Sequence, residues 1–300
     1  MHRLGIVAAL LVASAGLASG QKVFRASVDL VHFGVVVTDR SGAPVLGLTA
    51  DDFEIIEQGT AQKIKFFAGG QPASAPPLHL GFMIDNSGSM IQDIKDVRTA
   101  AIKFLNTVEN VIDVTLTDFD TAVRVARFGP DDFPRLIERI RGRKPDGYTA
   151  LYDALGVYLD GASTQTGDKI LVLYTDGGDT RSAINQGELL ELLKASDVTV
   201  YSIGYLQYQG SGRQDQQQIL TRFAAATGGQ AFFPSSLKDL DGMYDRILRD
   251  IAARYSLGYV SSNQTLDGAW REVKIRLVNK PEFRHAKIRT RLGYFAAMKQ

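Results

Sequence analysis

The sequence contains no cysteine, one tryptophan and four histidines among its 300 residues. Without cysteine, the chain has neither a disulfide framework nor a cysteine to which a lipid could be attached. The histidines are scattered, none has the spacing of a zinc site, and we interpret all of them as structural: they are His2, His32, His79 and His285. The Gly-x-Ser-x-Gly and phosphate-loop motifs are also missing, which removes two common catalytic signatures.

The chain also lacks a surplus of charge of either sign. It has 34 basic and 33 acidic residues, and Arg3 is the only charged residue among the first twenty. Such a balance argues against a nucleic-acid-binding protein. One local basic run occurs at 139–144, with Arg139, Arg141, Arg143 and Lys144. We interpret this run as a solvated helix end, with a phosphate site as the alternative.

No apolar run is long enough to cross a membrane, which takes about 20 residues in a helix. The nearest candidate, 4–17, follows Arg3 and precedes the small residues at 18–20. This layout is typical of a secretory signal peptide. We therefore predict a signal peptide at 1–20, cleaved near Gly20, and a secreted or periplasmic protein with no transmembrane segment after its removal. An uncleaved membrane anchor is the alternative.

The middle of the chain alternates between two patterns. The apolar runs 79–84 and 169–174 read as strands buried on both faces. Helical periodicity follows each of them, for example at 90–108 and 186–195. Strands that alternate with helices of this length indicate the α/β class. We predict a doubly wound, mainly parallel sheet with helices on both faces over residues 76–253.

The two flanks of this region have a different period. Apolar residues alternate with polar ones at Val31, Phe33, Val35 and Val37, and again at Val273, Ile275 and Leu277. A period of two is typical of half-buried antiparallel strands. Because a few strands cannot close a sandwich alone, we predict that 24–70 and 255–297 pair into one discontinuous β-sandwich. The α/β domain would be inserted in it; two separate β units are the alternative.

The segment Asp85-Asn86-Ser87-Gly88-Ser89 lies where the first buried strand ends and a helix is expected. In open α/β sheets, ligands bind at this carboxyl edge. One carboxylate and two hydroxyls at alternate positions are a partial ligand set for a hard cation. Taken alone, the segment also fits a turn in which a serine caps the helix.

Two further stretches should end at the same edge: Thr149, in a Gly-Tyr-Thr turn that opens a helix, and Asp176, after the strand at 169–174. Two carboxylates and three hydroxyls suit Mg²⁺, or Ca²⁺ or Mn²⁺, with water completing the shell. Two aspartates carry two negative charges, which just balance one divalent cation, and the three hydroxyl ligands are neutral. The predicted site therefore keeps an electrophilic position that suits an incoming carboxylate, and the helix N-termini expected near 90 and 150 add positive charge.

This arrangement resembles the von Willebrand factor type A domain and its metal-ion-dependent adhesion site, over about residues 76–250. The resemblance rests on three stretches in the family's order: 85–90, 147–155 and 171–177. It implies that Ser87, Ser89 and Thr149 offer hydroxyl ligands. It also implies that Asp85 and Asp176 bind the cation directly or through water, and that a partner's Glu or Asp completes the shell. The flanks resemble the exported bacterial proteins called VWFA-related, which are common in acidobacteria.

We therefore predict an exported, metal-dependent protein-binding module for adhesion or assembly, and not an enzyme. The alternatives are a Mg²⁺-dependent extracytoplasmic phosphoester hydrolase and a structural subunit of an envelope assembly. Three other acids lie near the predicted site in sequence. We interpret Asp118 and Asp120 as a solvated turn, with a supporting role at the site as the alternative. We interpret Asp93 as a surface acid of the helix, with an adjacent cation site as the alternative.

Overall fold

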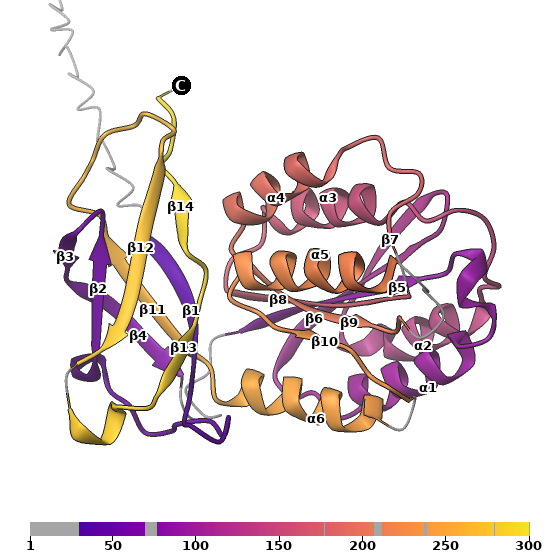
Figure 1. Ribbon diagram of the computed structural model, residues 1–300, viewed down its shortest axis with the longest axis horizontal. Coiled ribbons are helices and arrows are strands. Elements are labelled where there is room, and N and C mark those ends of the chain that lie inside the picture. Colours follow the sequence, from indigo (N-terminus) through magenta and orange to yellow (C-terminus); the bar gives the residue numbers. More distant parts are fainter. Residues whose placement is uncertain are drawn as a thin grey trace, which may run out of the picture.

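The computed structural model describes residues 30–69, 77–176, 178–206, 212–236, 239–278 and 280–299. The predicted signal peptide at 1–20 lies outside these residues. The described chain forms two parts that lie side by side, a β-sandwich and an α/β domain (Figure 1). Within the described residues, no helix has both the length and the apolar character needed to cross a membrane.

The α/β domain is built on a six-stranded sheet. In spatial order its strands are β10 (Ala231–Phe232), β9 (Val198–Gly204), β8 (Asp168–Thr175), β5 (Leu78–Asp85), β6 (Val111–Phe119) and β7 (Val123–Phe128). All neighbours pair in parallel except β7, which pairs antiparallel with β6 at the edge. The predicted fold class is confirmed, because the central strands β5, β8 and β9 are almost wholly buried and alternate with helices.

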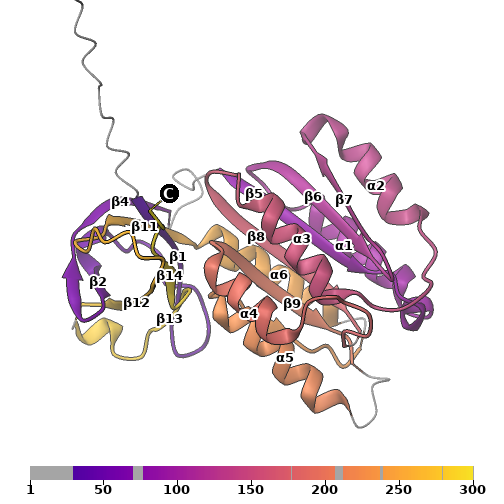
Figure 2. The same ribbon diagram turned by 90° about the horizontal axis from the view of Figure 1, so that it is seen from above.

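Helices cover both faces of this sheet (Figures 1 and 2). One face carries α1 (Ile94–Leu105), α2 (Phe133–Gly142) and α6 (Asp239–Ala252). The other carries α3 (Leu151–Ala162), α4 (Gln186–Ala195) and α5 (Arg213–Ala226). Each helix buries one apolar stripe, as its period of 3.6 residues predicts.

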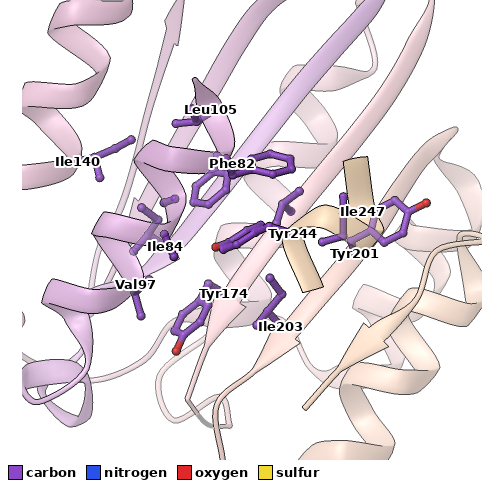
Figure 3. Close-up of a cluster of buried hydrophobic side chains, with 14 of the residues drawn as sticks. Phe82, Ile84, Val97, Leu105, Ile140, Tyr174, Tyr201, Ile203, Tyr244 and Ile247 are labelled. Carbon is purple, nitrogen blue, oxygen red and sulfur yellow. The ribbon is translucent and has the colours of Figure 1, made fainter. Parts of the chain in front are cut away.

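Aromatic packing holds the first face together. Phe82 of β5, Phe104 of α1 and Tyr244 of α6 pack as a triangle of rings: the Phe82 centroid lies 6.1 Å from that of Phe104 and 6.4 Å from that of Tyr244, which are 5.0 Å apart. Figure 3 shows Phe82 and Tyr244 in this cluster, with Ile84 and Val97 nearby. Burying a side chain of this kind stabilises the fold by roughly 1.5–3 kcal/mol. The packing fixes β5, and with it the strand end that carries Asp85.

The β-sandwich has two four-stranded sheets. One has the order β13 (Lys287–Arg289), β1 (Leu30–Thr38), β11 (Tyr255–Val260) and β4 (Ile64–Gly69). The other has the order β14 (Gly293–Phe295), β12 (Trp270–Leu277), β2 (Phe53–Glu57) and β3 (Thr60–Gln62). In both sheets, strands from the two ends of the chain pair with each other, antiparallel. The insertion of the α/β domain in a discontinuous sandwich is therefore confirmed, while the exact domain boundaries remain a prediction.

The two parts are joined without a flexible linker after α6. Arg254 is buried between α6 and β11, donates to Thr199 Oγ1 (2.7 Å) and lies 3.5 Å from Asp168 Oδ2. Ser256 of β11 donates to the same Asp168 carboxylate (2.9 Å). A Cβ at Gly34 would lie 1.7 Å from an Arg254 nitrogen, so only glycine fits beside this side chain. These contacts connect the sandwich to the base of the sheet.

Candidate metal site at the edge of the sheet

Asp85 is the last residue of β5, and its side chain is 0% exposed. Its Oδ1 accepts a hydrogen bond from the Ser87 amide (2.8 Å), and its Oδ2 accepts one from Thr175 Oγ1 (2.7 Å). Thr175 ends the neighbouring strand β8. The first predicted site residue is therefore fixed by its own loop on one side and by the next parallel strand on the other.

Hydroxyl groups connect this loop to Asp176. The Oγ atoms of Ser87 and Ser89 lie 3.1 Å apart, and Ser89 donates to Asp176 Oδ1 at 3.0 Å. Neighbouring oxygens around octahedral Mg²⁺ lie roughly 2.9 Å apart, from metal–oxygen distances of about 2.0–2.1 Å. The structure thus brings the Ser87, Ser89 and Asp176 side chains together at oxygen spacings that suit a small hard cation, next to the loop that holds Asp85.

Thr149 lies in the turn before α3, and this turn packs against both other loops. The Gly88 amide donates to the Gly147 carbonyl (3.0 Å), and the Asp146 amide donates to the Asn86 carbonyl (2.8 Å). On the other side, the Thr149 amide donates to Thr180 Oγ1 (2.9 Å). Thr149 is thus buried where the three loops meet, in the turn before a helix, while its role as a ligand stays a prediction.

Burial and like charge act together on the two carboxylates. Burial, followed by the nearby charge of Asp176, raises the pKa of Asp85 from 3.8 to about 7. Burial is also the main cause that raises the pKa of Asp176, which is 6% exposed, and Asp93 adds to it. Two ionised carboxylates are unfavourable in such a place unless a cation neutralises them. The donor set therefore fits a divalent cation.

Metal-ligating side chains of the usual kinds are few. The described residues contain no group of three or more His, Cys, Asp or Glu side chains that could hold a metal ion. A cation at this edge would depend on hydroxyl and water ligands beside the two aspartates. That composition is typical of sites for hard cations that take oxygen ligands.

The interpretation of Asp93 as a surface acid is wrong. The predicted helix start near residue 90 is a 3-10 turn, Gly88–Ile91, and α1 begins only at Ile94. Asp93 is consequently buried, its Oδ2 has no hydrogen-bond partner among the residues that the structure describes, and burial raises its pKa. The local helical periodicity gave no indication of this turn.

The interpretation of Asp118 and Asp120 as a solvated turn is also wrong, because both are buried among arginines. Asp118 Oδ2 accepts from Arg139 Nε and Nη2 at 3.1 and 2.9 Å. Arg143 bridges the acids, with Nε 3.3 Å from Asp118 Oδ1 and Nη2 3.2 Å from Asp120 Oδ2. Burial alone would raise the pKa of Asp120, but hydrogen bonds from Arg124 and the Ala122 amide outweigh it and lower the pKa. Arg139 and Arg143 are thus ion-paired, not merely a solvated helix end.

Asp120 and two residues that the sequence analysis did not name, Thr121 and Asp179, hold the Thr149 turn in place. The Asp120 carbonyl accepts from the Ala150 amide (2.8 Å), and Thr121 Oγ1 accepts from the Tyr148 amide (2.9 Å). Asp179 Oδ1 accepts from the Tyr152 amide (3.1 Å) and so caps the start of α3. Its position beside a helix N-terminus distant in sequence is visible only in three dimensions.

Comparisons with solved structures agree on the fold. The PilB minor pilin from Streptococcus sanguinis is 17% identical, with a TM-score of 0.50 over 60% of this chain and 62% of the pilin. The vWF domain of the type V pili tip protein Mfa5 from Porphyromonas gingivalis is 14% identical, with a TM-score of 0.50 over 59% of this chain and 95% of that domain. The pilus adhesin SpaC from Lactobacillus rhamnosus GG, in its open conformation, is 12% identical, with a TM-score of 0.50 over 82% and 48%.

The sequence itself matches the family model of the von Willebrand factor type A domain over residues 79–246, more than half of the chain. No curated protein sequence matches it. The matched residues run from the second residue of β5 into α6 and include the three loops that meet at Asp85, Thr149 and Asp176. The chain therefore belongs to the von Willebrand factor type A domain family.

Proposed function

We propose that this chain is an exported, metal-dependent protein-binding module that acts in adhesion or assembly and not as an enzyme. The observation that carries the proposal is the pair of buried carboxylates, Asp85 and Asp176, joined by serine hydroxyls at the carboxyl edge of the sheet. Their raised pKa values support a site made for a divalent cation.

The proposed cation is Mg²⁺, or Ca²⁺ or Mn²⁺, all of which take oxygen ligands. Ser87, Ser89 and Thr149 would supply hydroxyl oxygens to it. Asp85 and Asp176 would bind it directly or through water. When bound, the cation supplies a Lewis-acidic position for one more oxygen ligand, and an acidic side chain of a protein partner would fill that position.

The surroundings of the site support a protein as the partner. Ile91 and Tyr148 lie on two of the three loops, and each side chain is 65% exposed. Large apolar side chains beside a polar centre are typical of protein interfaces, where they surround and dehydrate the central contact. Pilins and pilus adhesins that share the fold also accord with adhesion. The signal peptide proposed for residues 1–20 would bring the module to such a partner.

A capture experiment tests this function. The purified chain is immobilised and exposed to cell-envelope extract in Mg²⁺ or in EDTA, for the wild type, Asp176→Ala and the control Asp241→Ala. Asp241 is an exposed aspartate of α6 that pairs with Lys103 of α1. We expect the wild type and the control to retain a protein partner in Mg²⁺ and to release it in EDTA. Asp176→Ala should retain no partner in either condition. Phosphoester turnover that is lost in Asp85→Ala, or capture that ignores both EDTA and Asp176→Ala, would contradict the proposal.

A further inference from the structure

A hollow of about 730 Å³ lies next to the candidate metal site. Among its lining residues are seven charged side chains: Arg124, Arg139, Arg143, Lys144, Asp118, Asp120 and Asp146. Four of these are basic and three are acidic, so the lining carries one excess positive charge. The formal net charge of the whole chain is also only +1, so this hollow does not belong to a generally basic surface.

The two buried aspartates of the hollow are already occupied. Asp118 is ion-paired with Arg139 and Arg143, as described above. Asp120 accepts hydrogen bonds from Arg143 and from both terminal nitrogens of Arg124, the latter at 3.1 and 3.0 Å. Each carboxylate is therefore neutralised by guanidinium groups on more than one side. A ligand entering the hollow would meet the basic groups rather than these acids.

The arginines retain hydrogen-bonding capacity after this pairing. A guanidinium has five N–H donors, and the bonds to Asp118 occupy two of those on Arg139. The side chains of Arg139 and Arg143 are each 35% exposed, and both line the hollow. Lys144 is exposed and forms no ion pair among the described residues. Planar donors of this kind suit a carboxylate, which a guanidinium can hold through two parallel bonds.

The hollow and the candidate metal site share a wall. Asp146 and Gly147 line the hollow, and both are hydrogen-bonded to the loop that carries Ser87 and Ser89. Thr121 also lines the hollow, beside Gly147, and its hydroxyl accepts a hydrogen bond from the Tyr148 amide, one residue before Thr149. A ligand that reached the metal site over this turn would therefore pass the basic hollow directly.

We propose that the hollow binds a second acidic side chain of the same protein partner whose first carboxylate would complete the metal site. This inference rests on the proposed function and specifies the partner, which would present two nearby Asp or Glu residues. A single carboxylate matches the single excess charge of the lining. A dianionic phosphate would exceed it, and the buried aspartates would disfavour a polyphosphate backbone.

Synthetic peptides test this inference without knowledge of the natural partner. One labelled Gly/Ser peptide carries a single Asp, and a series carries a second Asp roughly two to six residues away, at about 3.5 Å per extended residue. Affinities are measured by fluorescence polarisation in Mg²⁺ and in EDTA. For the wild type in Mg²⁺, we expect the best two-Asp peptide to bind about tenfold tighter than the one-Asp peptide, because the second contact is intramolecular.

Three variants locate the gain. Lys144→Gln lowers the charge of the hollow without exposing Asp118, and Arg139→Lys keeps the charge but loses the planar pair of donors. Arg135→Gln is the matched control, since Arg135 lies on the same helix, is exposed and pairs only with Asp132 among the described residues. We expect the two hollow variants to reduce the two-Asp advantage about threefold each, at unchanged one-Asp affinity, and the control to retain it.

The outcomes separate this inference from the proposed function. Equal Mg²⁺-dependent binding of both peptides, or an advantage that survives both hollow variants, would overturn the second subsite and leave the metal site standing. Tighter binding of a peptide with phosphoserine at the second position would overturn the assignment to a carboxylate. Binding that ignores Mg²⁺ would overturn the proposed function and this inference with it.

Discussion

Each part of the molecule contains a buried carboxylate with several polar neighbours, and the two sites differ in one respect. In the sandwich, Glu57 is 2% exposed and accepts hydrogen bonds from Tyr259 Oη (2.6 Å), Ser261 Oγ (2.6 Å) and Tyr294 Oη (3.0 Å). In the α/β domain, Asp85 is equally buried and also accepts from a hydroxyl and an amide. Only the second site adds another carboxylate, that of Asp176.

This difference separates structure from function. Around Glu57, one negative charge meets three hydroxyl donors that come from the opposite end of the chain, so the cluster fastens the two flanks together. Around Asp85, serine hydroxyls lead to a second acid, Asp176, whose charge disfavours the ionisation of Asp85. A buried acid surrounded by donors stabilises a fold, whereas two buried acids with shared hydroxyls are suited to bind a cation.

The largest expected effect concerns the second acid. Replacing Asp176 with alanine removes half of the negative charge that would hold the cation. We expect the affinity for Mg²⁺, measured by isothermal titration calorimetry, to fall at least about 100-fold, because the loss of an outer-shell partner alone costs roughly 10–100-fold. Asp241→Ala serves as the control and should keep the wild-type affinity. Retained Mg²⁺ affinity in Asp176→Ala would remove the basis of the comparison.

The same carboxylate-to-amide change should act in opposite directions at the two sites. In Glu57→Gln, the charge-assisted bonds from Tyr259, Ser261 and Tyr294 are lost or weakened. We expect the free energy of unfolding in urea to fall by about 2–3 kcal/mol, with Mg²⁺ affinity unchanged. A variant as stable as the wild type would show that the cluster does not fasten the flanks.

In Asp85→Asn, the metal-free protein should become more stable at neutral pH and above. Because the folded pKa of Asp85 is raised to about 7, the folded state holds a proton that the unfolded state has released between about pH 4 and 7. The stability of the wild type in EDTA therefore falls as the pH rises through this window. The uncharged amide does not ionise, so Asp85→Asn avoids this loss of stability. After its weaker hydrogen bonds are subtracted, we expect its free energy of unfolding to exceed that of the wild type by roughly 1–2 kcal/mol.

Urea unfolding in EDTA at pH 5 and pH 8 measures this effect, with the wild type and Asp241→Ala as references. The advantage of Asp85→Asn should be present at pH 8 and much smaller at pH 5. An advantage of equal size at both pH values would mean that ionisation of Asp85 is not its cause.

The sequence predicted the features that depend on local patterns and on the order of strands. The period-two flanks indicated the sandwich, and the apolar runs before Asp85 and Asp176 indicated parallel strands that end at one edge. Parallel strands necessarily bring their carboxyl ends together, so the strand order alone predicts that Asp85 and Asp176 lie at the same edge of the sheet. The narrower resemblance to acidobacterial VWFA-related proteins and the signal peptide remain predictions.

The features that the sequence missed depend on partners far away in the chain. Asp118 is buried because Arg139, 21 residues later, folds back onto it. Asp93 turns inward because a 3-10 turn precedes α1 and delays the start of the helix. Local periodicity predicts neither arrangement. The sequence pattern around an acid on an exposed helix face is the same as that around a buried acid whose partner lies far away in the chain.

The most direct test of the central claim is the position of a bound ion. Crystals of the chain without residues 1–20, grown with Mn²⁺, would be measured at the manganese absorption edge, beside crystals of Asp176→Ala. We predict one strong anomalous peak within coordination distance of the Ser87 and Ser89 hydroxyl oxygens, lost in the variant. An absent peak at saturating Mn²⁺, or a peak only at another site, would contradict the proposed metal site and the binding function that rests on it.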